Sequence, residues 1–274
     1  MIVGLLASKG GVGRTTLARS LAEAVTGGQQ GECSLYELDV CNPKIFSFFS
    51  WSGDQVNRRV SKVDNEKCKM VGKCLEACKF GAILKMDDKI GRRTGICRGC
   101  GLCREVCPEG AIDWDEIQAG EIGKIKDDKL AIVGGRMAHN DYWEGFLIRK
   151  VQQEFPLDPD QHIVVKAPLG LGATALRAVK QAEAMLLVTT THPSLENEIS
   201  TFGQIIQGFG VPGGIVLQGS EVTQSVKEHC ANLGLECFLV SHLENFGDDE
   251  TLQQHDPALA KQLDKIWDFV GGVS

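Results

Sequence analysis

Seven of the eleven cysteines in the chain lie between positions 68 and 107, and their spacing is that of metal ligands. In a reducing compartment such crowding indicates metal binding and not disulfide bonds. The later cysteines follow the order Cys97-x₂-Cys100-x₂-Cys103-x₃-Cys107-Pro108. Thiolates at this spacing bind three corners of a [4Fe–4S] cubane, and the fourth cysteine ligates a second cluster. Four cysteines can also bind zinc, but the even spacing and the terminal Cys-Pro favour iron–sulfur chemistry.

The cysteine-rich segment contains an internal repeat with an offset of 29 residues. Six residues of the first copy recur at that offset, which indicates a duplicated unit. They are Cys68, Cys74, Cys78, Gly81, Ala82 and Ile83, and their counterparts are Cys97, Cys103, Cys107, Gly110, Ala111 and Ile112.

The two predicted cluster sites differ in their number of ligands. Because the last cysteine of each copy serves the other cluster, one complete [4Fe–4S] set consists of Cys97, Cys100, Cys103 and Cys78. The other site retains only Cys68, Cys74 and Cys107, because Val71 stands where the counterpart of Cys100 would be. Three outcomes remain open there: a [3Fe–4S] cluster, a labile [4Fe–4S] cluster with one open iron, or no cluster.

A glycine-rich segment near the N-terminus predicts a phosphate-binding loop. It follows an apolar stretch at residues 2–7 and opens a predicted helix, and its residues are Lys9, Gly10, Gly11, Val12, Gly13, Arg14, Thr15 and Thr16. Glycines let backbone N–H groups surround phosphates, and the positive end of the helix dipole adds to that attraction. The hydroxyl of Thr15 lies where it could ligate Mg²⁺.

The flanking sequence predicts an α/β fold with a mostly parallel sheet. Apolar runs typical of buried strands alternate with helical patterns. The predicted strands are residues 2–7, 34–38, 163–167, 184–189, 214–217 and 236–240, and the predicted helices are 15–25, 142–154, 173–182, 195–209 and 222–233. Residues 61–118 lack this alternation and the strands resume after them. The sequence therefore predicts a discontinuous P-loop domain (1–60 and 119–274) with an inserted iron–sulfur domain at 61–118.

Charge and hydropathy limit the classes of partner. The net charge is −7 and the pI is near 5.4, which argues against a basic nucleic-acid or anionic-membrane surface. No apolar run approaches the roughly 18 residues of a membrane span, so a cytoplasmic location is expected. A C-terminal stripe with Leu259, Leu263, Ile266 and Trp267 predicts a helix packed on the sheet, since its polar face is not basic.

The glycine-rich loop resembles the deviant Walker A motif, KGGxGK[ST][ST], of the superfamily that includes MinD, ParA and the nitrogenase iron protein. The resemblance covers most of the chain and implies that Lys9 reaches the nucleotide of a dimer partner. It implies that Asp39, in a switch I segment, positions the attacking water. Residues 164–170 resemble switch II, and Gln218 stands at the position of an adenine-reading asparagine. The cysteine module resembles the α+β two-cluster ferredoxin fold, which a minority of Mrp-like, MinD-type ATPases carry as an insert.

Two departures from this pattern affect the expected chemistry. Arg14 replaces the second lysine of the motif, and a planar guanidinium does not substitute for a compact ammonium. Lys166 stands where an aspartate normally helps to hold Mg²⁺ through water. A lysine there would repel the metal or take its place beside the phosphates. Binding of ATP or ADP is expected, whereas Mg²⁺ and hydrolysis remain open, and an empty loop is the alternative.

The resemblance implies a nucleotide-dependent iron–sulfur accessory protein. The expected role is ATPase-like, in the assembly of iron–sulfur or molybdenum-containing clusters or in gated electron transfer to a partner. The expected partners are a second P-loop subunit, identical or related, and a client protein, with neither nucleic acid nor membrane. Two alternatives are a redox carrier whose P-loop host is a docking scaffold, and a positioning or partitioning ATPase.

Overall fold

The computed structural model describes residues 1–27, 31–240 and 257–272. Within these residues a nine-stranded sheet has the order β11-β10-β9-β1-β8-β2-β7-β6-β3. The strands from β11 to β7 are parallel, whereas β6 and β3 extend the sheet in antiparallel pairing. The bounds are β1 (Ile2–Leu6), β2 (Cys33–Glu37), β3 (Asp54–Val63), β6 (Ile112–Asp127), β7 (Leu130–Met137), β8 (His162–Lys166), β9 (Ala184–Thr190), β10 (Gly213–Gln218) and β11 (Glu236–Val240). The predicted α/β fold with a mostly parallel sheet is confirmed.

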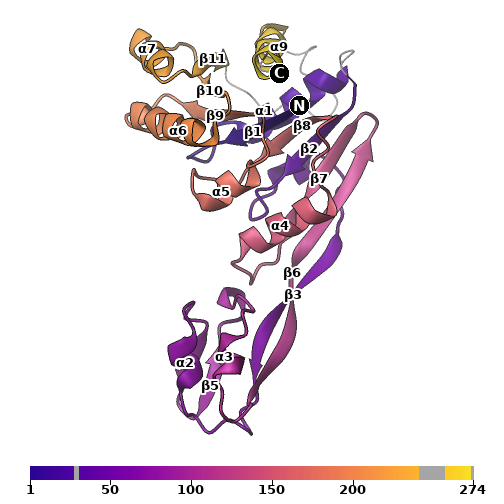
Figure 1. Cartoon of the computed structure of the whole chain (residues 1–274). Helices are drawn as coiled ribbons and strands as arrows, with labels where there is room; N and C mark the ends of the chain where they lie inside the picture. The colour runs from indigo at the N-terminus through magenta and orange to yellow at the C-terminus, as the bar shows by residue number, and fades with distance from the viewer. Residues whose placement is uncertain (28–30, 241–256, 273–274) are drawn as a thin grey trace.

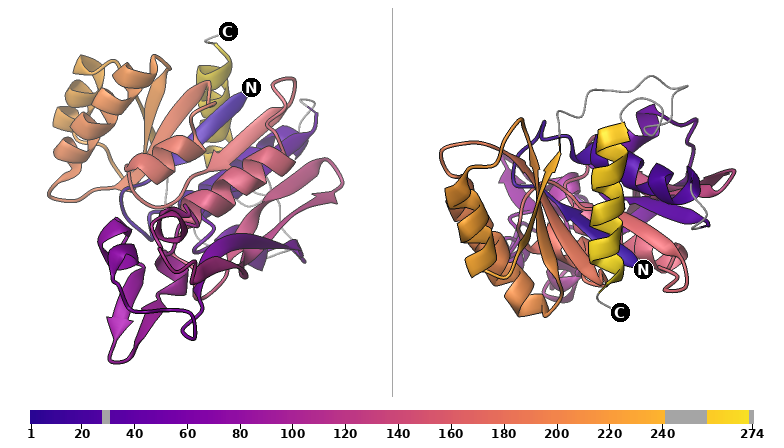
Figure 2. Two further views of the ribbon diagram at one scale, coloured as in Figure 1. Left: turned by 60° about the horizontal axis from the view of Figure 1, so that its bottom comes forward. Right: turned by 90° about the horizontal axis from the view of Figure 1, so that it is seen from above.

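Helices cover both faces of this sheet, as Figure 2 shows from two further sides. The side chains of β1 alternate between the two cores: Val3 and Leu5 pack with one, and Ile2 and Leu6 with the other. The first core includes α1 (Arg14–Gly27), the 3₁₀ helix η1 (Lys44–Ser47) and α9 (Pro257–Gly271). The second includes α4 (Glu144–Glu154), α5 (Ala173–Ala178), α6 (Leu195–Phe209) and α7 (Gln224–Asn232). Both faces of the sheet are therefore covered by helices and shielded from water, which explains the near-continuous apolar runs of the strands.

The C-terminal helix packs on the sheet domain as predicted. Leu263, Ile266 and Trp267 of α9 are buried, and the indole Nε1 of Trp267 donates a hydrogen bond to the carbonyl oxygen of Leu21 (3.0 Å). The side chain of Leu259 lies outside the described residues. Among the described helices, none is long and apolar enough to cross a bilayer.

A two-stranded ribbon joins the sheet to the cysteine-rich insert (Figure 1). Strand β3 pairs with β6 from Asp54↔Ile122 to Val63↔Ile112, with a bulge beside Val56. The far half of β6, from Gly120 to Asp127, pairs with β7 as well. Sequence patterns missed β3, β6 and β7. The ribbon strands are polar and half exposed, and β7 contains two adjacent glycines, so neither shows a strong strand signal. The ribbon also runs through both predicted domain boundaries, 61 and 118.

The insert repeats its backbone at the predicted offset. Helix α2 (Lys73–Ala77) and helix α3 (Leu102–Glu105) start at equivalent positions, and the hairpin of β4 (Ile83–Met86) and β5 (Lys89–Arg92) with the 3₁₀ helix η2 (Thr94–Ile96) connects the copies. Residues with positive φ also recur in pairs. They are Met70 and Gly99, Gly72 and Gly101, and Gly81 and Gly110. Since Met70 adopts a conformation that favours glycine, the repeat holds in backbone geometry where the residue types differ.

Candidate functional site

The phosphate loop opens an accessible cleft at the carboxyl edge of the parallel strands. It follows β1, which pairs with β8 on one side and β9 on the other, so the cleft lies where chain connections diverge. All eight predicted loop residues, Lys9 to Thr16, line it. The structure also brings Asp39, Lys166 and Gln218 to this cleft. The predicted nucleotide-site residues therefore share one place, and their roles stay predictions.

Lys9 is an exposed cation of this cleft. It stands at the start of the loop, while Thr15 and Thr16 are half buried in the first turn of α1. An exposed lysine is available to a second subunit, so the expected reach across a dimer is compatible with its position. It remains a prediction.

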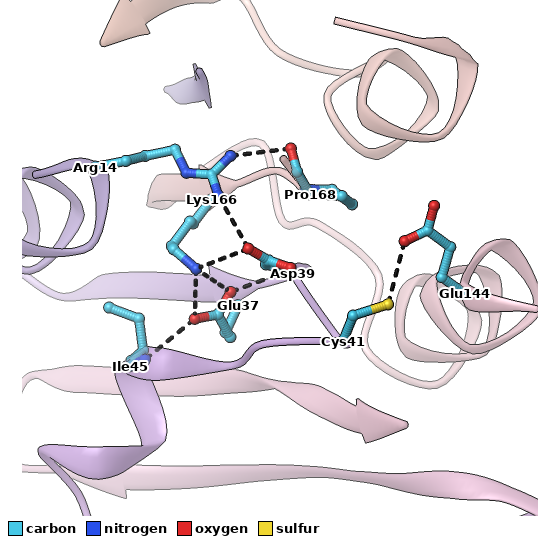
Figure 3. Close-up of polar contacts among 8 residues, drawn as sticks. All are labelled: Arg14, Glu37, Asp39, Cys41, Ile45, Glu144, Lys166 and Pro168. Carbon is cyan, nitrogen blue, oxygen red and sulfur yellow. Dashed lines mark hydrogen bonds and ion pairs between the residues drawn. The ribbon is translucent and has the colours of Figure 1, made fainter. Parts of the chain in front are cut away.

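The side chain of Arg14 forms a buried ion pair (Figure 3). Its Nη2 donates to Oδ2 of Asp39 at 2.9 Å, and its Nη1 donates to the carbonyl oxygen of Pro168 at 2.9 Å. Burial lowers the pKa of the guanidinium, and the charges of Asp39 and Glu37 oppose that shift. Arg14 therefore ties the start of α1 to the two predicted switch segments.

Lys166 forms further ion pairs next to the pair of Arg14 and Asp39. Its Nζ donates to both carboxylate oxygens of Glu37, at 2.8 and 2.9 Å, and lies 3.6 Å from Oδ2 of Asp39. Glu37 has no exposed surface and also accepts the backbone N–H groups of Asp39 (3.0 Å) and Ile45 (3.1 Å). Burial raises the pKa of Glu37, and the Lys166 ammonium opposes that rise. We call Arg14, Glu37, Asp39 and Lys166 the charge cluster.

Glu37 is a site residue that sequence patterns did not single out. The signal was available, because an acidic residue ends a strand of buried residues and precedes Asp39 by two positions. Sequence alone does not show that Lys166, 129 residues away, would be its partner.

The seven clustered cysteines line two separate cavities in the insert. One cavity is lined by Cys78, Cys97, Cys100 and Cys103, and the other by Cys68, Cys74 and Cys107. The structure thus brings together the same two sets that the crossed rule predicts. A metal cluster supplies redox chemistry when bound, and these thiols are the groups that would hold it. Their ligation stays a prediction.

Backbone N–H groups point at several of these sulfur atoms. Ser61 donates to Sγ of Cys97 (3.5 Å), Ala82 to Sγ of Cys78 (3.3 Å) and Met70 to Sγ of Cys68 (3.4 Å). Burial works to raise the pKa of Cys97, but hydrogen bonds from the backbone of Ser61 and Gly99 outweigh it, and the pKa is lowered. Such donors stabilise thiolates and tune the potential of a cluster.

Val71 leaves one edge of the three-cysteine cavity open. It lines that cavity and is 52% exposed. Its counterpart Cys100 is exposed too, at the edge of the complete set. The missing ligand would therefore have stood at the solvent side of the site.

A short segment after β7 contacts both the nucleotide cleft and the insert. We call residues 137–144 the junction segment. At its start, Met137 donates its N–H to the carbonyl oxygen of Val40, next to Asp39 (2.9 Å). At its end, Glu144 accepts a hydrogen bond from the thiol of Cys41, which lines the cleft (3.3 Å; Figure 3). The Cys41 thiol has a pKa of about 12, raised first by burial and then by Glu144, so it acts as a neutral donor.

The same segment binds the loop that carries Cys97. Asp141 is buried and forms an ion pair with Arg58 of the ribbon, through both carboxylate oxygens. Arg58 in turn donates to the carbonyl oxygens of Thr94 (3.2 Å), Gly95 (3.3 Å) and Cys97. Neither Arg58 nor Asp141 was predicted, because nothing in their local sequence marks a contact between residues 83 positions apart.

Comparison with known families supports the iron–sulfur part of this description. The 4Fe-4S binding domain family matches residues 93–113. A 57-residue match to the indolepyruvate oxidoreductase subunit IorA of Methanothermobacter marburgensis is 39% identical, and it covers 21% of this chain but 9% of that subunit. An uncharacterized protein of Methanocaldococcus jannaschii is 23% identical over 219 residues, 79% of each chain.

Comparison with solved structures describes the whole chain. The MinD cell division protein of Aquifex aeolicus superposes with a TM-score of 0.55 and 12% identity, over 98% of this chain and 96% of that one. A plasmid partition protein of Borrelia burgdorferi bound to AMPPNP gives 0.53 and 13%, over 99% and 98%. The chain has the fold of the MinD and ParA P-loop ATPases. In this MinD/ParA fold the iron–sulfur segment is an addition to the sheet edge, carried by β3 and β6.

The charge cluster leads to a prediction about stability. Lys166→Met should lower the free energy of unfolding by about 3–5 kcal/mol, because it leaves Glu37 buried without its cation. Urea unfolding of the cluster-loaded protein under anaerobic conditions, followed by circular dichroism, measures this. The paired change Glu37→Gln with Lys166→Met should recover most of the loss. Lys44→Met, an exposed lysine of the same cleft, should change stability by less than about 0.5 kcal/mol. Equal stability of Lys166→Met and wild type would show that Glu37 does not depend on Lys166 for its stability in the interior.

The Val71 position leads to a prediction about cluster type. We expect the oxidised protein to show the EPR signal of a [3Fe–4S] cluster. Val71→Cys should abolish that signal and add about one iron per chain, because a fourth thiolate completes the set. Val71→Ala, which opens the same edge without a ligand, is the matched control and should keep the signal. Loss of the signal in both variants, or in neither, would show that position 71 does not decide nuclearity.

Proposed function

We propose that this chain is a nucleotide-dependent iron–sulfur protein in which nucleotide at the P-loop gates electron transfer from the insert to a protein client. The observation that carries the proposal is the junction segment, which contacts Val40 and Cys41 beside the cleft and the Cys97 loop through Arg58 and Asp141. A change of the loop after β2 on nucleotide binding would therefore act on the backbone that presents Cys97. An accessory role in assembling iron–sulfur or molybdenum-containing clusters uses the same coupling.

The coupling has favourable physical properties. Arg58 and Asp141 are 3% and 2% exposed, so their ion pair is little screened by water. Tyr142 adds a backbone bond from its N–H to the carbonyl oxygen of Gly95 (3.3 Å). Trp143, at the start of α4, has the guanidinium groups of Arg58 and Arg98 over its ring at 5.7 and 5.0 Å. These short-range contacts make the Cys97 loop and the start of α4 move as a unit.

A second subunit belongs to this proposal. The exposed Lys9 is free to reach a partner's nucleotide, and a related P-loop subunit or a second copy would complete the cleft. A cytoplasmic setting and a protein client for the clusters are the remaining parts. The redox-carrier alternative draws support from the charge cluster, because Arg14 and Lys166 are both engaged with carboxylates.

Thermodynamic linkage supplies the test. If nucleotide and cluster are coupled, saturating ADP or ATP must shift the reduction potential of the cluster, and a tenfold difference in affinity between redox states corresponds to about 59 mV. Anaerobic redox titration followed by EPR, with and without nucleotide, measures the shift. We expect a shift of about that size in the wild type.

The variant Arg58→Lys should keep the cluster but lose most of the nucleotide-dependent shift, because a lysine cannot reproduce the fork to Asp141 and the three carbonyls. Arg59→Lys is the matched control, since Arg59 is the next residue of the ribbon but is exposed and stacks over Trp114 (4.9 Å). Tight nucleotide binding without any change of potential in the wild type would overturn gating and favour the redox carrier.

A further inference from the structure

The charge cluster occupies the position at which the MinD/ParA fold implies a magnesium ion. Mg²⁺ in nucleotide sites takes oxygen ligands and keeps waters that nearby carboxylates hold. The residues here do not fit that requirement. Both carboxylates of the cluster already face cations: Glu37 is bound by Lys166 through both oxygens, and Oδ2 of Asp39 is shared by Arg14 and Lys166.

The balance of charge explains why no further cation is needed. Arg14 and Lys166 contribute two positive charges and Glu37 and Asp39 two negative charges, so the cluster is neutral. Lys166 is 1% exposed and still lines the floor of the cleft. Replacing an aspartate by a lysine at this position changes the charge of the side chain from −1 to +1. This difference of two positive charges equals the charge of one Mg²⁺ ion.

We propose that this cleft binds ADP or ATP without Mg²⁺, with the ammonium of Lys166 standing in for the metal beside the phosphates. The inference rests on the proposed nucleotide dependence and names the ligand of that same site as the metal-free nucleotide anion. The remaining counter-charge comes from Lys9 and Lys44, which line the cleft without an ion-pair partner among the described residues.

A buried polar group points to a ligand at the same place. Gln218 is 5% exposed, and its Nε2 has no hydrogen-bond partner among the described residues. The amide lies against Gly13 of the phosphate loop: a Cβ built on Gly13 would come 1.7 Å from Nε2, and Gly13 has a φ of +71°. A buried donor without an acceptor is costly, and an oxygen or ring nitrogen of a bound nucleotide would satisfy it. The cleft is therefore lined by two lysines, Lys9 and Lys44, and by a buried donor without an acceptor among the described residues.

Calorimetric titration of the full-length, cluster-loaded protein with ADP and with ATP tests this, in Mg²⁺ and in EDTA. We expect the Kd measured in Mg²⁺ and the Kd measured in EDTA to differ by less than about threefold. A tenfold difference would correspond to about 1.4 kcal/mol. Mn²⁺ EPR provides a second measurement in which Mn²⁺ replaces Mg²⁺. The spectrum should show Mn²⁺ released from the nucleotide as the protein binds it.

Two variants separate the role of Lys166 from general charge. Glu37→Gln with Lys166→Met removes one charge of each sign, so the cluster stays neutral, and it should weaken binding in EDTA by about tenfold or more, because the stand-in ammonium is lost. Lys44→Met, the matched control, should weaken binding by the same factor in EDTA and in Mg²⁺.

The outcomes distinguish this inference from the function on which it rests. Binding of the wild type only in Mg²⁺, or Mn²⁺ retained in the protein–nucleotide complex, would overturn the metal-free site and leave the nucleotide-dependent function intact. Absence of binding in both conditions would overturn both. The inference is supported if the wild type binds nucleotide equally well in both conditions and the variant Glu37→Gln with Lys166→Met binds it more weakly in EDTA.

Discussion

The cancellation of buried charge at the carboxyl edge of the sheet is the constraint on which the cleft depends. An ion removed from water is costly unless an opposite charge and hydrogen bonds replace its hydration. Arg14 begins α1, Glu37 ends β2, Asp39 lies in the following loop and Lys166 ends β8, so one neutral cluster ties together the elements around the phosphate loop. Removing Lys166 would leave Glu37 buried without its cation. The geometry of the cleft is therefore a consequence of electrostatic balance as much as of apolar packing.

Attachment of the insert follows a different principle. A two-stranded ribbon alone is marginally stable and can swing. Here β6 runs without interruption from the insert into pairing with β7, and the buried pair of Arg58 and Asp141 holds the ribbon against the junction segment. The insert is thus an extension of the sheet edge, seen below the sheet domain in Figure 1. Through the Cys97 loop, that continuity connects the complete cysteine set to the P-loop domain.

The cleft and the insert are the two parts of the molecule that carry candidate ligand-binding groups. The MinD/ParA fold supplies a loop for an anionic ligand, and the repeat supplies two sets of thiols with N–H groups directed at sulfur. The open edge at Val71 and the neutral charge cluster are both departures from the motifs that surround them. In each case a side chain that is not a usual metal ligand stands where the motif predicts a metal ligand or a metal-holding carboxylate.

The sequence by itself determined what depends on short spacing along the chain. The cysteine run, the 29-residue repeat, the phosphate loop and the alternation of buried strands and helices all follow from local geometry, since neighbours in the chain remain neighbours in space. Only the tertiary structure decided what Arg14 and Lys166 contact, because their partners lie 25 and 129 residues away. It also decided that polar β3 and glycine-containing β7 are strands, and that Arg58 meets Asp141. These features depend on pairing and burial between distant segments, for which no local periodicity exists.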